Sequence, residues 1–328
     1  MTRNAIGLAC VILTLLPGNA SRAEELAAST TITAGELAVE FRDNSQSPQI
    51  LSGVQSLRNL ALAPDYDAFD PDAPGSSAGL NFEHIIAGHS TPDNKFTPRH
   101  GRYTLHQIDE QTCELRRNRE DSPWDVSSTL RYKVTPPYYI DFEFRCTPHD
   151  VSKFGVRNYA LFFWADYMNE VDDIALHFRG VNRLGDDEQW IAADAPQTHP
   201  DYLGGGTYRH LDAQPLTYDD DHNFKLNVWS YDWPRYTVPC YVGRAAHGMT
   251  LMLMFDRSYT SADEIRFSLF KFKVKDEHRR PAWDFQYVIH SVEAEKEYGF
   301  RGRLLWKKFV SYDDCLDEYN VWVKKVQE

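Results

Sequence analysis

The sequence predicts an all-β protein: two packed antiparallel sheets, in a jelly roll or a larger sandwich, followed by one C-terminal helix. Two observations support this class. From Leu80 onward, short runs alternate between apolar and polar residues with period two and are separated by polar turns, which is typical of antiparallel strands. No helical segments recur between these runs, so parallel α/β architectures are disfavoured, and no fixed repeat indicates a propeller or a solenoid.

The individual strands follow from the same pattern. Residues 128–135 and 139–146 alternate on either side of Pro136-Pro137, which predicts two neighbouring antiparallel strands. Residues 159–165 are uniformly apolar, as expected for a strand that is covered on both faces, whereas 173–179 are mixed. Further strands are expected at 35–42, 224–229, 249–255, 264–274, 285–289 and 298–309, and 50–62 could form a strand or a short helix.

One helix is expected, at 311–327. Ser311 followed by Asp314 resembles a capping box with aspartate in the place of glutamate. Apolar residues then recur at helical spacing at Leu316, Tyr319, Val323 and Val326. We expect this helix to lie against the sheets.

The N-terminal end resembles a secretory signal peptide. Thr2-Arg3 precedes an apolar run over 5–16 and a small-residue exit at Ser21-Arg22-Ala23. We therefore expect cleavage near Ala23 and a periplasmic or extracellular protein. No later run approaches the roughly 20 apolar residues that a transmembrane helix needs, so membrane insertion is not expected.

Composition divides the rest of the chain in two. Residues 24–79 are rich in Asp, Ser, Pro and Ala, and we interpret them as an N-terminal extension with strand and turn-rich parts; 80–328 form the sandwich domain with its helix. The formal net charge of -13 becomes two units more negative if Arg3 and Arg22 are removed, so a role that depends on binding nucleic acid is disfavoured. Four cysteines follow Ala23; they allow three disulfide pairings or free buried thiols, and both alternatives stay open.

The region 190–244 is unusually rich in aromatic, histidine and acidic residues, which we place in loops. Residues 202–210 are expected to form a glycine-hinged loop that presents Tyr208 and His210. Sugars stack on aromatic rings and accept hydrogen bonds from charged side chains, so this region predicts a saccharide site. The candidate substrate-binding residues are Trp190, Tyr208, Tyr231, Trp233, Tyr241 and Arg244. The alternative is that each ring packs in the core.

Histidines supply the candidate catalytic groups. His177 and Arg179 share one face of an expected strand, where an imidazole beside a guanidinium could transfer a proton and hold an anionic or hydroxyl-rich group. The full set of catalytic candidates is His100, His177, His210 and Arg179. A strand histidine that bonds a neighbouring carbonyl is the structural alternative.

Neither an organic cofactor nor a metal site is predicted. Gly204-Gly205-Gly206 lacks the lysine and the strand-to-helix context of a phosphate loop. His84 and His89 lack companion ligands. The acidic runs 172–173 and 219–221 could bind calcium through oxygen, but a solvated turn is the preferred interpretation.

The segment Pro98-Arg99-His100-Gly101, with His177 further along, resembles the order of two histidines in galactose-mutarotase-like supersandwich proteins, which include aldose epimerases and several polysaccharide lyase domains. The resemblance covers about 80–310. It implies that His100 or His177 protonates the sugar ring oxygen and that a carboxylate near the C-terminal end acts as the base. The chain departs from the family at Tyr103-Thr104, where the epimerase motif usually carries an arginine, and no glutamate between 264 and 297 is singled out.

Residues 281–289 and 298–304 are also similar to secreted bacterial proteins of undefined activity, which adds no mechanism.

Three classes of function follow from the sequence. The first class is a carbohydrate-active enzyme acting on a polysaccharide or oligosaccharide: a lyase with Arg and His beside a uronate, or a hydrolase with two carboxylates about 5 to 10 Å apart. The second is a non-catalytic carbohydrate-binding module, and the third a structural or interaction protein.

The enzyme hypothesis makes one geometric prediction. Five residues are expected to converge on one concave face: His100, His177, Arg179, His210 and Arg244.

Overall fold

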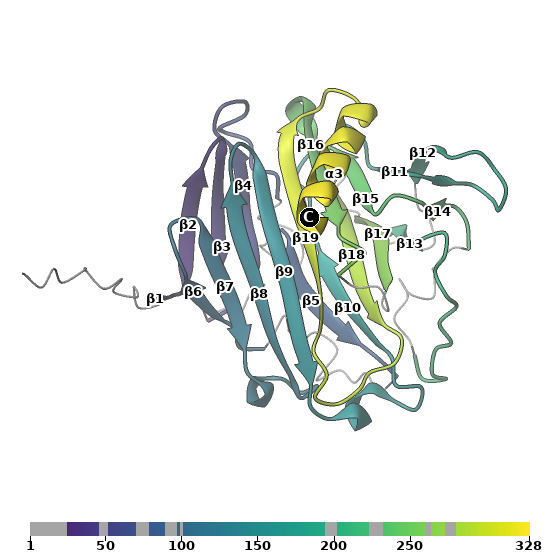
Figure 1. The fold of residues 1–328 in the computed structure, drawn as a ribbon. Coiled ribbons are helices and arrows are strands. Elements are labelled where there is room, and N and C mark those ends of the chain that lie inside the picture. Colours follow the sequence, from purple (N-terminus) through teal and green to yellow (C-terminus); the bar gives the residue numbers. More distant parts are fainter. Residues whose placement is uncertain are drawn as a thin grey trace, which may run out of the picture.

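The computed structural model describes residues 25–45, 52–69, 79–88, 97–98, 101–193, 202–222, 232–259, 264–272 and 280–328. In these residues the chain forms two antiparallel sheets, of 11 and 8 strands, that pack face to face (Figure 1). A C-terminal helix lies on the outer face of the larger sheet. The predicted all-β class, with two packed sheets and a closing helix, is confirmed.

The larger sheet combines strands from the whole length of the chain. Each hydrogen-bonded neighbour is antiparallel, and β14 (Arg235–Tyr236) pairs with β11 beside the main order. The order is β1 (Glu25–Ala27), β6 (Thr104–Gln107), β7 (Thr112–Arg117), β8 (Val126–Thr135), β9 (Tyr139–Pro148), β19 (Tyr298–Lys308), β16 (Met249–Phe255), β15 (Cys240–Arg244), β11 (Leu176–Val181) and β12 (Gln189–Ala193).

The smaller sheet also joins early and late parts of the chain. Three short 3-10 helices connect consecutive strands along the chain: Arg119–Asp121, Val151–Phe154 and Ala246–Gly248. The strand order is β13 (Tyr202–Tyr208), β17 (Glu264–Phe272), β18 (Pro281–Ile289), β10 (Ala160–Ala165), β5 (Asn81–Ile86), β4 (Gly53–Asn59), β3 (Leu37–Arg42) and β2 (Ser29–Ala34).

Aromatic rings fill the space between the sheets. Trp164 of β10 stacks on Phe285 of β18, with ring centroids 5.1 Å apart, and the edge of Phe300 from β19 meets Trp164 at 4.9 Å. Each fully buried ring of this size stabilises the fold by about 2 kcal/mol through removal of apolar surface from water. The period-two pattern therefore has a clear cause, because alternate residues of each strand enter this core.

The helix α3 (Tyr312–Gln327) begins where the sequence predicts. The Ser311 hydroxyl accepts a hydrogen bond from the Asp314 N–H at 3.1 Å, which satisfies a free donor of the first turn. Cys315 and Trp322 face inward and form a second apolar cluster with residues of β15, β16 and β19. In the part of the chain that the structure describes, no helix is long and apolar enough to cross a membrane.

Several expected elements take a different form. The prediction of a glycine-hinged loop at 202–210 was wrong, because Tyr202–Tyr208 forms the strand β13, which pairs with β17. Trp190, in β12, and the segment Cys240–Arg244, in β15, also belong to strands and not to loops. The three consecutive glycines at 204–206 give no apolar–polar alternation, although their backbone still pairs with β17. The strand expected at 224–229 lies outside the described residues.

The first four strands, within 25–59, extend both sheets: β1 joins the larger sheet, and β2 to β4 form one edge of the smaller sheet. The four cysteines are buried and free, so the thiol alternative applies to Cys113, Cys146, Cys240 and Cys315.

Candidate functional site

The outer face of the smaller sheet carries polar side chains that are as buried as the core. In β18, Trp283, Phe285 and Tyr287 point toward the larger sheet, so the alternating residues Asp284 and Gln286 point to the other side. Their relative exposures are 2% and 0%. The same face of the neighbouring strands adds Arg266 and Ser268 from β17, Thr207 from β13 and His84 from β5; we call this surface the polar face.

Neutral groups at its centre bond one another. Gln286 Nε2 lies 3.2 Å from Ser268 Oγ and 3.4 Å from Thr207 Oγ1, and the two hydroxyls lie 3.3 Å apart. Gln286 Oε1 is buried and has no hydrogen-bond partner in the described residues. An unsatisfied buried acceptor costs about 1 to 3 kcal/mol.

An ion pair borders this array. Arg266 Nη2 donates to Glu264 Oε2 at 2.8 Å, and His290 Nε2 lies 3.2 Å from the same oxygen. Burial raises the pKa of Glu264, but Arg266 and His290 outweigh it and hold that pKa below its usual value. Arg266 Nε and Glu264 Oε1 are buried without partners in the described part of the chain.

Asp284, near the other end of the polar face, interacts electrostatically with Glu83 of β5. Asp284 accepts the backbone N–H of Asp166 at 2.9 Å. Burial raises the pKa of Asp284 well above its usual value, the hydrogen bond from the Asp166 N–H lowers it, and the negative charge of Glu83 raises it. The Glu83 carboxylate is fixed by the Tyr167 hydroxyl and by His84 Nε2, each at 3.0 Å. One carboxyl therefore holds its proton while a second acid lies close by.

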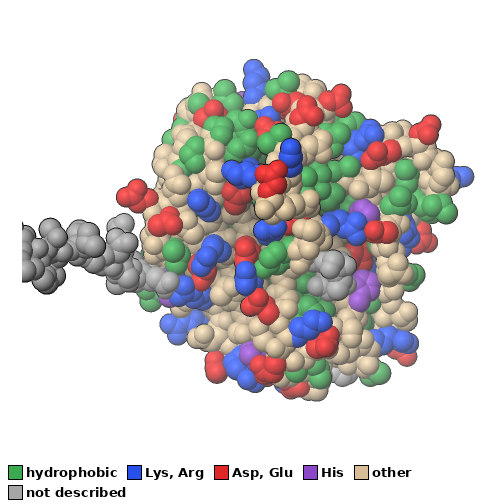
Figure 2. Space-filling view, viewed as in Figure 1, with side chains coloured by type: hydrophobic (Ala, Val, Ile, Leu, Met, Phe, Trp, Pro, Cys, Tyr) green, Lys and Arg blue, Asp and Glu red, His purple; other side chains and the backbone are tan. Residues whose placement is uncertain are grey.

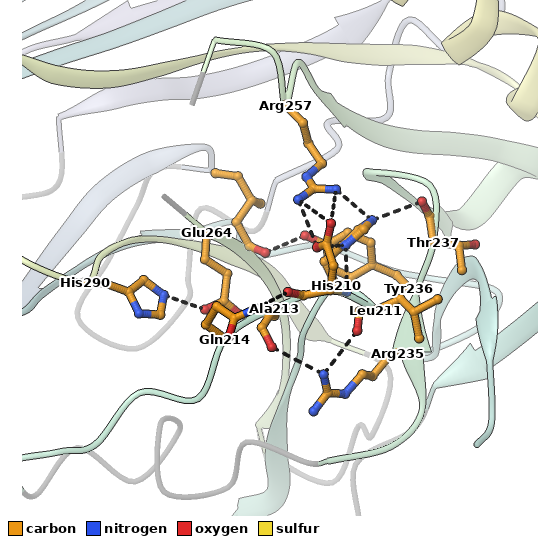
Figure 3. A network of polar contacts seen from close by, with 12 residues as sticks. His210, Leu211, Ala213, Gln214, Arg235, Tyr236, Thr237, Arg257, Glu264 and His290 are labelled. Atoms are coloured by element: carbon orange, nitrogen blue, oxygen red, sulfur yellow. Dashed lines mark hydrogen bonds and ion pairs between the residues drawn. The ribbon is translucent and has the colours of Figure 1, made fainter. Parts of the chain in front are cut away.

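His210 forms a separate network that adjoins the Glu264 end of the polar face (Figure 3). Its Nδ1 bonds Asp212, and its Nε2 lies 3.0 Å from Arg257 Nη1 and 3.2 Å from the Thr237 carbonyl. Burial, followed by the charge of Arg257, lowers the pKa of His210. In the neutral ring one nitrogen carries the proton and donates, and the other accepts.

His177 lies on the other sheet, in a group that includes Trp190 and Arg244. The rings of His177 and Trp190 lie 4.8 and 5.0 Å from that of Tyr312, and the Arg244 guanidinium lies 4.8 Å from the centroid of Phe309. His177 Nε2 is 2.9 Å from Asp173 Oδ2. Burial and then Arg244 lower the pKa of His177, although Asp173 opposes them. We call this group the His177 cluster.

The residues expected to converge lie in different places. His177, Trp190 and Arg244 lie together, and Arg179 is linked toward His210 through Glu188 and Thr237. Tyr208 and Tyr241 are 2% and 0% exposed and belong to the core between the sheets. Trp233 packs against Arg235, with 5.2 Å from the guanidinium to the ring centroid. His100 and Tyr231 lie outside the described residues. The proposed roles of all these residues stay predictions.

Two acidic runs considered for calcium have other partners. Asp219 accepts the backbone N–H groups of Val156 and Arg157 at 3.0 and 2.9 Å, which fixes a turn. Asp173 binds His177 and the Ala175 N–H. Within the described ranges, no group of three or more His, Cys, Asp and Glu side chains has the arrangement of a metal site.

Sequence reasoning missed the polar face, although one signal for it was present. The uniformly apolar β10 predicts cover on both faces of its sheet, so polar residues of neighbouring strands must be buried too. Asp284 and Gln286 alternate with aromatic residues, and neither was among the predicted site residues. Chemically, the polar face offers hydrogen bonds to hydroxyl groups, one protonated acid and a second acid beside it.

No protein-family model matches this chain, and no curated protein sequence does. Its structure is similar to that of a candidate aldose 1-epimerase from Escherichia coli K12, with 7% identity, a TM-score of 0.49, and coverage of 88% of this chain and 100% of that one. It is also similar to an aldose epimerase homologue from Caenorhabditis elegans, with 12% identity, a TM-score of 0.42 and the same two coverages. A candidate kojibiose phosphorylase from the human microbiome has 7% identity and a TM-score of 0.30, over 91% of this chain and 32% of that chain.

Proposed function

We propose that this protein is a carbohydrate-active enzyme that hydrolyses a glycosidic bond at the polar face. Asp284 is the general acid and Glu83 the second carboxyl group of the reaction. The observation that carries this proposal is the pairing of a buried, proton-holding Asp284 with Glu83, which Tyr167 and His84 fix in place. Two carboxyl groups with different protonation states are the usual requirement of glycoside hydrolysis.

The rest of the polar face suits a polyhydroxylated substrate. Gln286, Ser268 and Thr207 form a connected set of donors and acceptors, and the free Gln286 Oε1 accepts from a sugar hydroxyl. Buried polar groups of this kind give orientation and specificity to a small-molecule site. The adjoining His210 network keeps a neutral imidazole nearby, in line with the predicted participation of that histidine.

The test is incubation of the purified protein with acidic and neutral polysaccharides, followed by two readouts: new reducing ends, and absorbance near 235 nm from unsaturated uronates. Hydrolysis gives reducing ends without absorbance. Asp284→Asn and Glu83→Gln should each lower the rate by about 10²- to 10⁴-fold, the usual contribution of a positioned acid or base.

A matched control separates chemistry from stability. Glu114→Gln removes a buried glutamate of the larger sheet, away from the polar face. This variant should keep the activity. Equal losses in the control and in the Asp284 and Glu83 variants would contradict the assignment. His177→Asn and His210→Asn in the same assay test the roles predicted for those histidines.

The two readouts also distinguish the other functions. Growth of absorbance would identify a lyase and remove the hydrolytic role of the two carboxyl groups. Binding without either signal would favour a non-catalytic carbohydrate-binding protein. The Gln286–Ser268–Thr207 array supports this second candidate, because its neutral side chains can bind sugar hydroxyls without any change of protonation.

We further propose that the protein acts outside the cytoplasm. The support is the N-terminal pattern of Thr2-Arg3, the apolar run over 5–16 and the small-residue exit that ends at Ala23. N-terminal sequencing of the exported protein should begin at or near Glu24. Recovery of the intact N-terminus in the cytoplasmic fraction would contradict export.

A further inference from the structure

A groove runs along helix α3 on the outer face of the larger sheet, on the opposite sheet from the polar face. Its volume is about 350 Å³. The floor consists of outward residues of β8, β9 and β19, and one wall consists of Trp322, Lys325 and Val326 of α3. Figure 2 views this face and shows basic side chains interspersed with acidic ones beside the helix.

Positive charge predominates in this groove. The strand register places Lys133, Asp141 and Arg303 in one row, and the next row repeats the order cation, carboxylate, cation. The lining holds five Lys and Arg side chains and two carboxylates, in a chain whose formal net charge is -13; Arg131 and Arg301 also bond Glu114 and Asp256 outside the lining. Because the whole molecule repels anions at long range, a local excess of cations favours a specific anion and not unspecific attraction.

Some of these cations are already committed. Arg303 donates two hydrogen bonds to Asp141, at 2.7 and 2.9 Å, and its guanidinium lies 4.3 Å from the centroid of the Tyr139 ring. These contacts fix its position. Lys133 and Lys325 are exposed, and neither has an ion pair or a hydrogen bond within the residues that the structure describes. Their charges are therefore left for a ligand.

The groove also has an apolar side. Trp322 and Val326 line it, with the Arg303 guanidinium 5.9 Å from the Trp322 ring centroid. We propose that the groove binds a small organic anion with at least two oxyanion groups, held by Lys133 and Lys325, whose apolar part lies against the α3 wall. This site is separate from the proposed catalytic face and does not depend on its activity.

The test is isothermal titration calorimetry of the full chain at low salt with two probes. Citrate supplies carboxylates, and fructose 1,6-bisphosphate supplies phosphates; maltose is the neutral control. At least one anion should bind, with an affinity that added maltose leaves unchanged. The probe that binds more tightly identifies the oxyanion. Raising the salt concentration should weaken the binding.

A charge-matched pair of variants tests the location. Lys133→Glu with Lys325→Glu should weaken binding at least tenfold. Lys153→Glu with Lys324→Glu makes the same change in net charge at exposed lysines outside the groove and should leave the affinity nearly unchanged. An equal loss in both double variants, or no binding of either anion, would overturn the proposal. The variant Asp284→Asn should bind the anion with the affinity of the wild type. Failure of the hydrolase proposal can therefore be distinguished from failure of the anion-site proposal.

Discussion

Asp166 makes the sharpest prediction about stability. Asp166 comes directly after β10, two residues beyond the inward-facing Trp164. Its side chain lies near the hydroxyls of Tyr132 and Tyr241 in the core. Both carboxyl oxygens are buried and lack a hydrogen-bond partner among the described residues. Burial raises the pKa of Asp166 well above its usual value, so the folded protein keeps this group protonated.

The magnitude follows from proton linkage. In the unfolded chain Asp166 titrates at its ordinary pKa of 3.8, so above that pH folding takes up one proton at this site. The free energy of unfolding then falls by about 1.4 kcal/mol for each pH unit, up to the folded pKa. Asp166→Asn keeps the shape of the side chain and removes the proton. The stability of the variant relative to wild type should therefore rise by about 1.4 kcal/mol per pH unit.

The assay is urea unfolding of both proteins at pH 5, 6, 7 and 8. The difference between the two free energies is the readout, because the opposite contributions of His177 and His210, whose pKa values are lowered, cancel in it. Equal m-values in the two proteins check that the unfolded states are comparable. A difference that stays constant with pH would show that Asp166 is ionised in the folded protein and refute the reasoning.

Three further substitutions have clear expected outcomes. Ser311→Ala removes the cap of α3 and should cost about 1 kcal/mol in thermal or urea unfolding; no change would mean that the cap is redundant. Gly243→Ala places a Cβ 2.3 Å from ring atoms of the buried Trp283 and should destabilise by about 1 to 3 kcal/mol, with a shift in tryptophan fluorescence as a second readout. Arg266→Met leaves the buried Glu264 without its main partner and should cost about 3 to 5 kcal/mol in the free energy of unfolding near pH 7. Because the wild-type pKa of Glu264 is lowered, this penalty should shrink as the pH falls through that pKa. A penalty that does not change with pH would contradict the ion-pair account.

Much of the fold could be predicted because alternation in a strand directly reports which face meets the core. The paired strands β8 and β9 and the helix α3 begin and end within a few residues of their expected positions. The strands at 202–208 and 240–244 were missed for a physical reason. Backbone pairing stabilises β13 and β15, while glycine and mixed residues give no period-two signal.

The candidate site was less predictable because it depends on pairing between distant strands. His84 and Gln286 both lie opposite Phe163 in the sheet, and nothing in their local sequences indicates that proximity. Aromatic density instead drew attention to 190–244, where Tyr208 and Tyr241 turn out to be core residues. A single sequence shows which residues are chemically capable, but the register decides which of them meet.

The polar face also sets an order for the synthesis and assembly of the molecule. The strand β10 lies between β5 and β18, so residues of the polar face come from 81–86 and from 281–289. A nascent chain that stops before 281 leaves one edge of β10 open, and contacts this far apart in sequence form slowly. The polar face therefore forms late, after nearly the whole polypeptide has emerged.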